Sequence, residues 1–180
     1  MVYRVSKTPL EGCFEFTPGI FTDNRGVSIK PYNVDLLKSM GVGHGFAEDL
    51  MVTSYKGVLR GLHFQKPPYA QAKLIWCARG GIFDVAVDIR KNSPTYGSFV
   101  YFHIDCRKHN VVYIPAGFAH GYQVMEEDTT VFYKMSSVYS PENEGGILYN
   151  SLGIAWPLNY PIISEKDLSL PGFKDFVSVF

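Results

Sequence analysis

The stretch AKLIWCARGGIFDVAVDI, residues 72–89, decides the fold class of this chain. It contains two apolar runs, 72–78 and 81–89, on either side of an Arg-Gly-Gly turn. Side chains alternate along both runs with the period of a β-strand. The turn suits a tight hairpin, because glycine adopts the backbone conformations that such turns need. The stretch therefore predicts two strands joined by a hairpin.

Similar short runs, broken by Gly, Pro, Asn and Asp, follow one another along the chain and predict further strands. They cover residues 27–32, 50–55, 58–65, 98–105, 111–114, 119–124 and 130–137. We expect one helix over 34–40, capped by Asn33 and ended by Gly41, and a short helical turn from Ser164. Many strands with few helices favour a sandwich or jelly-roll barrel over a parallel α/β sheet.

Composition limits the classes of protein to which the chain can belong. Its 180 residues fit a single domain over residues 1–180, and 46% hydrophobic residues suffice for a packed core. Lys plus Arg equals Asp plus Glu at 17 each, which argues against a nucleic-acid or membrane surface. Three widely spaced cysteines and an N-terminus without a long apolar run predict a reduced, cytoplasmic location.

Strand periodicity sorts the ionisable side chains into shared faces. Each of four faces carries one or two polar groups among apolar neighbours: Lys73, Ile75 and Cys77; Ile82, Asp84, Ala86 and Asp88; His120, Tyr122 and Val124; Val131, Tyr133 and Met135. Strict alternation places Arg60 and His63 on opposite faces of their strand. A bulge at Gly61 would bring both to one pocket.

These residue types suit the transfer of a proton next to a ketone. His63 suits the base, because imidazole titrates near neutral pH, and Asp167 would fix its tautomer. Tyr133 suits the acid on the opposite face of a sugar ring. Lys73 and His120 suit the oxygen of the enolate that forms in between.

Arg60 suits a phosphate, because its planar guanidinium matches phosphate oxygens. Each of these residues also has an ordinary structural explanation when it is taken singly, such as a buried, satisfied histidine or a solvated lysine. From the residues alone, the chain is an all-β barrel with a polar interior.

Six strings of the sequence add a resemblance to a known family. They are GVLRGLHFQ (57–65), FDVAVDIR (83–90), NSPTYG (92–97), IPAGFAHG (114–121), GIAWPL (153–158) and SEKD (164–167). In this order they closely resemble the dTDP-4-dehydrorhamnose 3,5-epimerase family, over nearly the whole chain. A single short motif would be far less specific.

The resemblance implies a jelly-roll, cupin-like β-barrel with a few short peripheral helices, a homodimer, and no cofactor or metal. It implies an isomerase that inverts C3, C5 or both in a nucleoside-diphosphate 4-keto-6-deoxyhexose, with roles in deoxysugar and cell-surface polysaccharide biosynthesis. His63 resembles the family's proton acceptor, with Asp167 as its partner, and Tyr133 resembles the proton donor. Lys73 resembles the residue near the ketone.

The resemblance also assigns contacts to the substrate. The expected binding residues are Arg25, Lys30, Glu48, Arg60, His120, Tyr139, Glu144 and Lys166, with Asp84 in support. Tyr139 matches the aromatic that stacks on the nucleotide base. Some positions depart from the family: Lys30 replaces a Glu, Glu48-Asp49-Leu50 replaces Gln-Asp-Asn, and residues 149–152 replace a Trp-Asp-Asp-Pro-like stretch. Because a Glu-to-Lys change reverses charge, a cytidine-, guanosine- or uridine-linked sugar, or inversion at C3 only, remains an alternative.

Three rival functions are kept. A metal-dependent cupin would need a His-x-His pair and a nearby carboxylate, whereas this chain has a lone His63 at that place. A 3,4-ketoisomerase would use the same proton chemistry but move the carbonyl. A non-catalytic sugar-nucleotide-binding barrel would keep Arg60 and Tyr139 but has no use for Tyr133 opposite His63.

Overall fold

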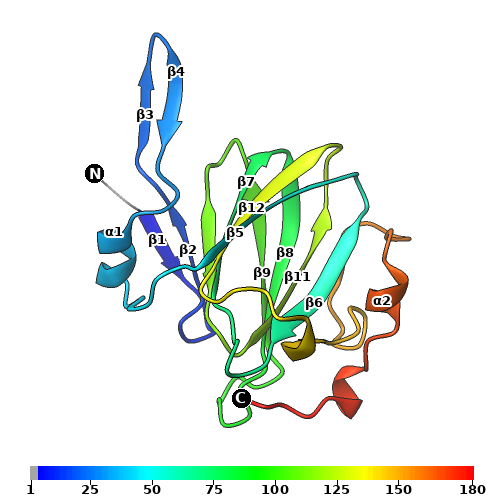
Figure 1. Cartoon of the computed structure of the whole chain (residues 1–180). Helices are drawn as coiled ribbons and strands as arrows, with labels where there is room; N and C mark the ends of the chain where they lie inside the picture. The colour runs from blue at the N-terminus through cyan, green and yellow to red at the C-terminus, as the bar shows by residue number, and fades with distance from the viewer. Residues whose placement is uncertain (1–3) are drawn as a thin grey trace.

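The structure, a computed structural model, describes residues 4–180 as two facing antiparallel sheets and a separate hairpin (Figure 1). The six-stranded sheet has the order β1 (Arg4–Lys7), β2 (Phe14–Thr17), β10 (Val111–Ile114), β7 (Lys73–Arg79), β12 (Thr129–Met135) and β5 (Glu48–Ser54). The five-stranded sheet has the order β13 (Glu144–Gly146), β6 (Leu59–Gln65), β11 (Phe118–Val124), β8 (Gly81–Asp88) and β9 (Phe99–Asp105). The hairpin pairs β3 (Ile20–Asp23) with β4 (Gly26–Ile29). The helices are α1 (Val34–Ser39), α2 (Glu165–Leu168) and the 3-10 turns η1 (Pro141–Asn143) and η2 (Phe173–Asp175).

The main core lies between the two sheets. Ile75 and Val131 enter it from the six-stranded sheet, and Ile82, Ala86 and Val124 enter it from the five-stranded sheet. These residues belong to the four faces that periodicity defined, so all four faces point inward. Neighbouring strands are antiparallel and often far apart in sequence, as in a jelly roll. The prediction of an all-β, cupin-like barrel with short helices is confirmed.

Both sheets are also covered on their outer sides. Leu37 of α1 and Val42 pack against Phe16 and Leu74 of the six-stranded sheet. The C-terminal segment, including Phe176, packs against the outer face of the five-stranded sheet. Because it is covered on both faces, every residue of β8 is buried.

The predicted hairpin at Gly80 is wrong. β7 pairs with β10 and β12 in one sheet, whereas β8 pairs with β11 and β9 in the other. The turn is therefore a corner between the sheets. Gly80 has φ +68°, and a Cβ there would lie 2.2 Å from Thr129 Oγ1. Glycine is needed at this corner, but alternation along a strand does not say which strand becomes its neighbour.

The other predicted strands are found within two residues of their predicted ends, except that β4 ends at Ile29, three residues ahead of the predicted 32. Four strands, β1, β2, β3 and β13, escaped prediction. β1 and β13 lie at sheet edges, and β1 and β3 bury none of their side chains. β1, β3 and β13 lack the alternation of buried and exposed residues that makes a strand visible in a sequence, whereas β2 alternates but is only four residues long.

Both helix starts are confirmed. The Asn33 side-chain oxygen accepts a hydrogen bond from the Leu36 amide at 2.9 Å, which caps α1. Ser164 Oγ accepts one from the Asp167 amide at 3.1 Å, which caps α2. The second cap brings Asp167 to the body of the barrel, where it is buried.

The predicted bulge at Gly61 is also present. His63 lies opposite His120 and Arg60 lies opposite Tyr122, so two residues of β6 face one residue of β11. Gly61 has φ +120°, and a Cβ there would lie 2.5 Å from Gly121 Cα. The bulge turns Arg60 and His63 toward the same cavity, which strict alternation would have prevented.

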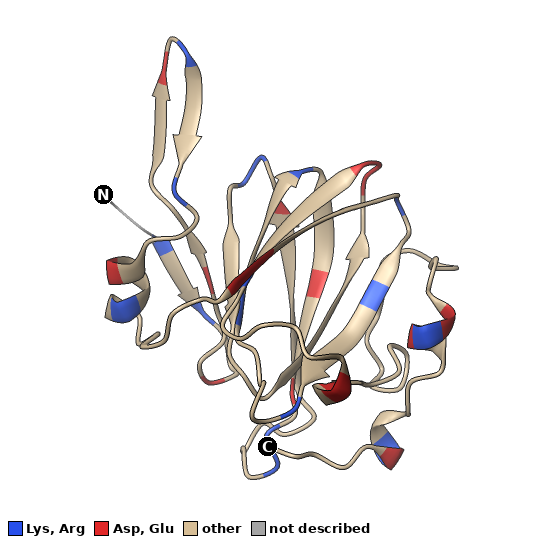
Figure 2. Cartoon of the chain, viewed as in Figure 1, with Lys and Arg blue, Asp and Glu red and all other residues tan. Residues whose placement is uncertain are grey.

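The β3–β4 hairpin projects away from the two sheets (Figure 1). Arg25 lies at its tip, where Figure 2 shows one positive and one negative segment. The Arg25 guanidinium pairs with Asp23 at 2.6 Å, and both are exposed. None of the helices in residues 4–180 has the length and hydropathy to cross a bilayer.

Candidate active site

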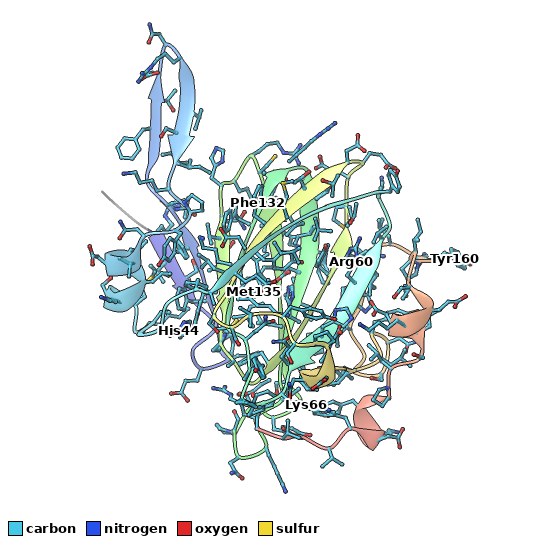
Figure 3. All side chains as sticks on the ribbon, viewed as in Figure 1. His44, Arg60, Lys66, Phe132, Met135 and Tyr160 are labelled. Carbon is cyan, nitrogen blue, oxygen red and sulfur yellow. The ribbon has the colours of Figure 1, made fainter. Side chains whose placement is uncertain are left out.

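A cavity of about 570 Å³ opens between the two sheets. It brings together nine of the predicted site residues: Arg60, His63, Lys73, His120, Tyr133, Tyr139, Glu144, Lys166 and Asp167. Two lining residues, Arg60 on β6 and Met135 on β12, are labelled in Figure 3. The cavity is large enough for a small-molecule ligand, and aliphatic side chains from Leu50 to Ile163 complete its wall.

His63 forms a hydrogen-bonded pair with Asp167. His63 Nε2 lies 2.7 Å from Asp167 Oδ1, and the Gly61 amide donates to Asp167 Oδ2 at 3.1 Å. Burial works against ionisation of this carboxyl, but the hydrogen bonds from His63 and Gly61 outweigh it and lower the pKa of Asp167. An ionised Asp167 accepts the Nε2–H, which leaves the lone pair of His63 on Nδ1. The imidazole is 30% exposed and lines the cavity, so it is accessible to a ligand.

Tyr133 lines the same cavity from the other sheet. It lies on β12, whereas His63 lies on β6. Burial raises the pKa of the Tyr133 phenol well above its ordinary value. The phenol is therefore protonated at neutral pH and has a proton to give.

His120 forms a second pair, with Asp84 on the neighbouring strand β8. His120 Nε2 lies 2.6 Å from Asp84 Oδ1, and the two side chains are 4% and 0% exposed. Burial lowers the pKa of His120 despite the opposing effect of Asp84. A neutral His120 that donates Nε2–H to Asp84 has an acceptor, Nδ1, on its other side. It therefore suits contact with a ligand hydroxyl better than with an enolate oxygen.

Lys73 is the buried cation of the site. Its Nζ donates to the His63 carbonyl at 3.4 Å, and its side chain is 9% exposed. Burial lowers the pKa of Lys73 to about 8, although Asp84 and Glu144 oppose the shift. The ammonium form therefore predominates at pH 7 and is lost as the pH rises above 8. Such an ammonium can stabilise a developing oxyanion.

A polar cluster forms the rim of the cavity. The Tyr139 hydroxyl and Lys166 Nζ both donate to Glu144 Oε2, each at 2.7 Å. Burial disfavours the Glu144 anion, but these two donors prevail and lower its pKa. Glu48 accepts from the Tyr139 amide at 2.7 Å and so holds this aromatic residue in place without lining the cavity. Tyr139 is 52% exposed, which leaves its ring free to stack on a planar ligand.

Arg60 extends from β6 at the cavity wall. Its Nε and Nη2 donate to Ser54 Oγ at 3.3 and 3.2 Å. No carboxylate in residues 4–180 forms an ion pair with it. Unlike Arg90 or Arg107, this guanidinium keeps its charge available for an anionic ligand.

Three predicted binding residues lie outside this cavity: Glu48, which holds Tyr139, and the two residues Arg25 and Lys30. Arg25 and Lys30 belong to the projecting hairpin and its exit, and neither lines the cavity of its own chain. Conversely, the cavity includes Tyr122, Gln65 and Gln71, to which sequence reasoning gave no role. Tyr122 was visible as a neighbour of His120 on one strand face, but a tyrosine on an inward face is most often core.

Comparisons with known proteins agree with this geometry. The family model described as dTDP-4-dehydrorhamnose 3,5-epimerase matches residues 7–175. The chain belongs to this family. The enzyme of that name from Shigella flexneri is 41% identical over 96% of this chain and 97% of its own length.

Solved structures of dTDP-4-dehydrorhamnose 3,5-epimerases superimpose closely on the chain. The structure from Bacillus anthracis, with TDP and PPi bound, is 39% identical with a TM-score of 0.92, and the match covers 95% of this chain and 99% of that one. A Legionella pneumophila enzyme in complex with dTDP-4-keto-L-rhamnose is 33% identical with a TM-score of 0.93, over 98% and 95% of the two chains. The expectations of the epimerase family, of an isomerase acting on nucleotide sugars and of the reaction type are confirmed.

The metal-dependent rival can be compared with the same site. In the described part of the chain, no group of three or more His, Cys, Asp or Glu side chains is arranged to hold a metal ion. The two histidines of the cavity instead pair with one carboxylate each. Each arrangement orients an imidazole for work on a proton or a hydroxyl.

Proposed function

We propose that this chain inverts C3 and C5 of a dTDP-linked 4-keto-6-deoxyhexose, with His63 as the base and Tyr133 as the acid. The observation that carries the proposal is the placement of these two residues. A carboxylate-paired imidazole and a protonated phenol line one cavity from opposite sheets. A sugar ring between them presents one face to each.

The first step removes a proton next to the ketone. The C–H bond breaks, its proton goes to His63 Nδ1, and its electron pair moves onto the ketone oxygen as an enolate. Asp167 stabilises the imidazolium because an ionised carboxylate lies 2.7 Å from Nε2. The Gly61 amide keeps that carboxylate in position.

Lys73 stabilises the enolate oxygen. Its ammonium is buried in the cavity wall, where a charge interacts more strongly than it does in water. His120, held neutral by burial and oriented by Asp84, accepts a hydrogen bond from a sugar hydroxyl at Nδ1. Lys73 thus stabilises the oxyanion, and His120 orients the sugar ring.

The second step returns a proton to the opposite face. The Tyr133 O–H bond breaks, its proton bonds to the carbon, and the enolate collapses to the ketone. The product has inverted configuration because removal and return occur on different faces. A second round at the other carbon next to the ketone gives the double inversion, once His63 and Tyr133 have recovered their original protonation states.

The diphosphate and base lie toward the rim. Arg60 and Lys166 supply positive charge for the phosphates, and Tyr139 supplies a half-exposed ring for the base. Lys30 and Glu48 differ from the family pattern at binding positions. The identity of the nucleotide base is therefore supported by fewer residues than the sugar and the diphosphate are.

The test is a solvent-exchange experiment in D2O. The protein is incubated with 4-keto-6-deoxyhexoses linked to dTDP, CDP, GDP and UDP, and NMR follows deuterium at C3 and C5. We expect exchange at both carbons with the dTDP sugar. Exchange with a sugar linked to another nucleotide, and none with the dTDP sugar, would identify that other nucleotide as part of the substrate. Exchange at C3 only would identify a 3-epimerase.

Two variants test the roles within that experiment. We expect His63→Ala to abolish exchange, and Tyr133→Phe to impair inversion more than exchange, because only inversion needs the acid. Movement of the carbonyl to C3 in the product would instead identify a ketoisomerase. Absence of exchange with every sugar, by a folded protein, would overturn the proposal and favour a binding barrel.

We further propose a homodimer in which the β3–β4 hairpin of one chain reaches the cavity of the other. The hairpin carries two predicted binding residues, Arg25 and Lys30, yet neither lines the cavity of its own chain. It also exposes apolar side chains, with Phe21 50% and Val27 57% exposed. A projecting apolar hairpin suits burial against a second copy.

Subunit complementation tests this arrangement. Arg25→Ala and His63→Ala homodimers should both be weak or inactive. Unfolded together and refolded as mixed dimers, they should recover activity, because one of the two sites then has His63 from one chain and Arg25 from the other. No recovery in mixed dimers, or a monomer by light scattering, would contradict the proposal.

A further inference from the structure

Tyr122 is a cavity residue whose hydroxyl has no hydrogen-bond partner within residues 4–180. It lies on β11 next to the Gly61 bulge, opposite Arg60, and is 2% exposed. A buried hydroxyl without a partner costs roughly 1–3 kcal/mol compared with a satisfied one. Phenylalanine would fill the same space without that cost, so the hydroxyl calls for a functional reason.

The surroundings of that hydroxyl point to the acid of the reaction. The rings of Tyr122 and Tyr133 lie 6.3 Å apart between centroids, at an interplanar angle of 45°. Burial raises the pKa of Tyr122, while the Tyr133 hydroxyl, the Arg60 guanidinium and the Ser54 hydroxyl oppose the rise. Arg60 is the cross-strand neighbour of Tyr122 and donates to Ser54, so these groups and Tyr133 surround the Tyr122 side chain.

These groups form a row that begins at the Arg60 guanidinium and runs through Ser54 and Tyr122 to Tyr133. Arg60 donates to Ser54 Oγ, so the Ser54 hydroxyl hydrogen is free to point toward Tyr122. Tyr122 in turn has its own hydrogen free to point toward Tyr133.

A hydrogen bond from Tyr122 to Tyr133 assists the reaction only when the Tyr133 oxygen carries a negative charge. A phenolate forms when Tyr133 gives its proton to the substrate carbon, in a buried environment that disfavours an anion. A hydrogen bond from a neutral hydroxyl to that anion is stronger than one to the neutral phenol. It would therefore favour the transition state over the resting enzyme.

We propose that Tyr122 is a positioning residue that donates a hydrogen bond to the Tyr133 oxygen as Tyr133 transfers its proton to the substrate. The proposal rests on the acid role of Tyr133 in the proposed function. In the step, the Tyr133 proton bonds to carbon and the O–H electron pair stays on Tyr133. Tyr122 keeps its own proton and shares it in the new hydrogen bond.

The test uses Tyr122→Phe, which keeps the buried ring and removes only the hydroxyl. We expect inversion to slow about 10–100-fold, the range for a hydrogen bond to a charged group. Deuterium exchange, which needs the base and the groups that stabilise the enolate but not the acid, should stay within about twofold of the native rate. A purely structural defect would lower both rates together, so a constant ratio of inversion to exchange would overturn the proposal.

A double-mutant cycle adds a second measurement. If Tyr122 acts through Tyr133, the double variant Tyr122→Phe/Tyr133→Phe should invert substrate at the same rate as Tyr133→Phe alone. If the loss of rate in the double variant equals the product of the two single losses, the two tyrosines act independently, and the proposal is overturned. The matched control is Tyr113→Phe, a buried tyrosine outside the cavity whose hydroxyl bonds to His44 at 2.9 Å; it should leave the ratio unchanged.

The two levels of inference fail in different ways. If the native protein exchanges no 4-keto sugar, the proposed function fails and the role of Tyr122 fails with it. If the native protein inverts its substrate and Tyr122→Phe inverts it equally fast, only the role of Tyr122 is lost.

Discussion

The cavity contains two histidine–aspartate pairs that are alike in geometry and unlike in surroundings. His63 and His120 are cross-strand neighbours on β6 and β11, and each binds a carboxylate through Nε2, at 2.7 and 2.6 Å. One imidazole is 30% exposed and the other 4%. The open one can accept a proton and share the charge with Asp167. The buried one also lies near Lys73 and His63, which disfavour a second positive charge.

The comparison shows that a hydrogen-bonded pair does not define a catalytic role by itself. Solvation and neighbouring charges decide whether the imidazole gains a proton or stays neutral. Here the same two residue types provide a base in one place and a ligand-orienting acceptor in the other.

The largest expected effect follows from substituting Asp167, the carboxylate that pairs with the more exposed histidine, His63. Asp167→Asn should slow deuterium exchange about 10²–10⁴-fold, because an amide neither stabilises the imidazolium nor enforces the tautomer with a free Nδ1. The measurement is the NMR exchange rate at C3 and C5. Glu165→Gln, on the same helix but exposed, is the control and should retain the native rate. A loss below tenfold for Asp167→Asn would remove the proposed role of the pair.

The next effect concerns the cation beside both pairs. Because the pKa of Lys73 is about 8 and the ammonium is the active form, kcat/KM should fall about tenfold per pH unit above pH 8. Lys73→Met should lower the rate about 10²–10³-fold at pH 7 and abolish this alkaline fall. The check is a pH–rate profile of both proteins. A native profile that stays flat to pH 10 would exclude Lys73 as the group that titrates.

A smaller effect is expected from the carboxylate of the buried pair. Asp84 raises the pKa of Lys73, so Asp84→Asn should move the alkaline fall to lower pH. Its loss of rate at pH 7 should be about twofold, far less than that of Asp167→Asn. Equal losses at pH 7 would mean that the two pairs do the same work and would end the distinction between them.

The smallest effect concerns how the two carboxylates are held. Asp84 lies in a strand with paired neighbours on both sides, whereas Asp167 depends on a short helix capped by Ser164. Ser164→Ala should lower the free energy of unfolding by about 1 kcal/mol and reduce exchange less than twofold. Urea denaturation and the exchange assay measure the two quantities. An unchanged stability would show that the cap does not hold α2.

Local signals in the sequence predicted a good part of the fold. Alternation located most strands and all four inward faces, and the Asn33 and Ser164 caps marked both α-helices. The conflict between Arg60 and His63 on one strand predicted the Gly61 bulge. Each of these depends on residues a few positions apart, so a single segment contains the whole signal.

Longer-range features escaped prediction. The same glycine-rich turn suits a hairpin and a corner between sheets, so the sequence at Gly80 does not separate the two. The pairing of β7 with β10 and β12, and of β8 with β11 and β9, shows a corner. The hydroxyl of Tyr122 became notable only when its lack of a partner was visible. Neither the pairing of the strands nor the lack of a partner for a buried hydroxyl can be predicted from a single strand.

The sequence by itself therefore determined which side chains face inward, where the helices begin and which family the chain belongs to, because periodicity, caps and ordered strings are local or linear properties. Only the tertiary structure decided that His63 is open while His120 is buried, that Lys73 loses solvation, and that Arg25 lies far from its own cavity. Solvation and the choice of neighbour depend on how distant segments pack, and that packing sets the protonation states on which the chemistry depends.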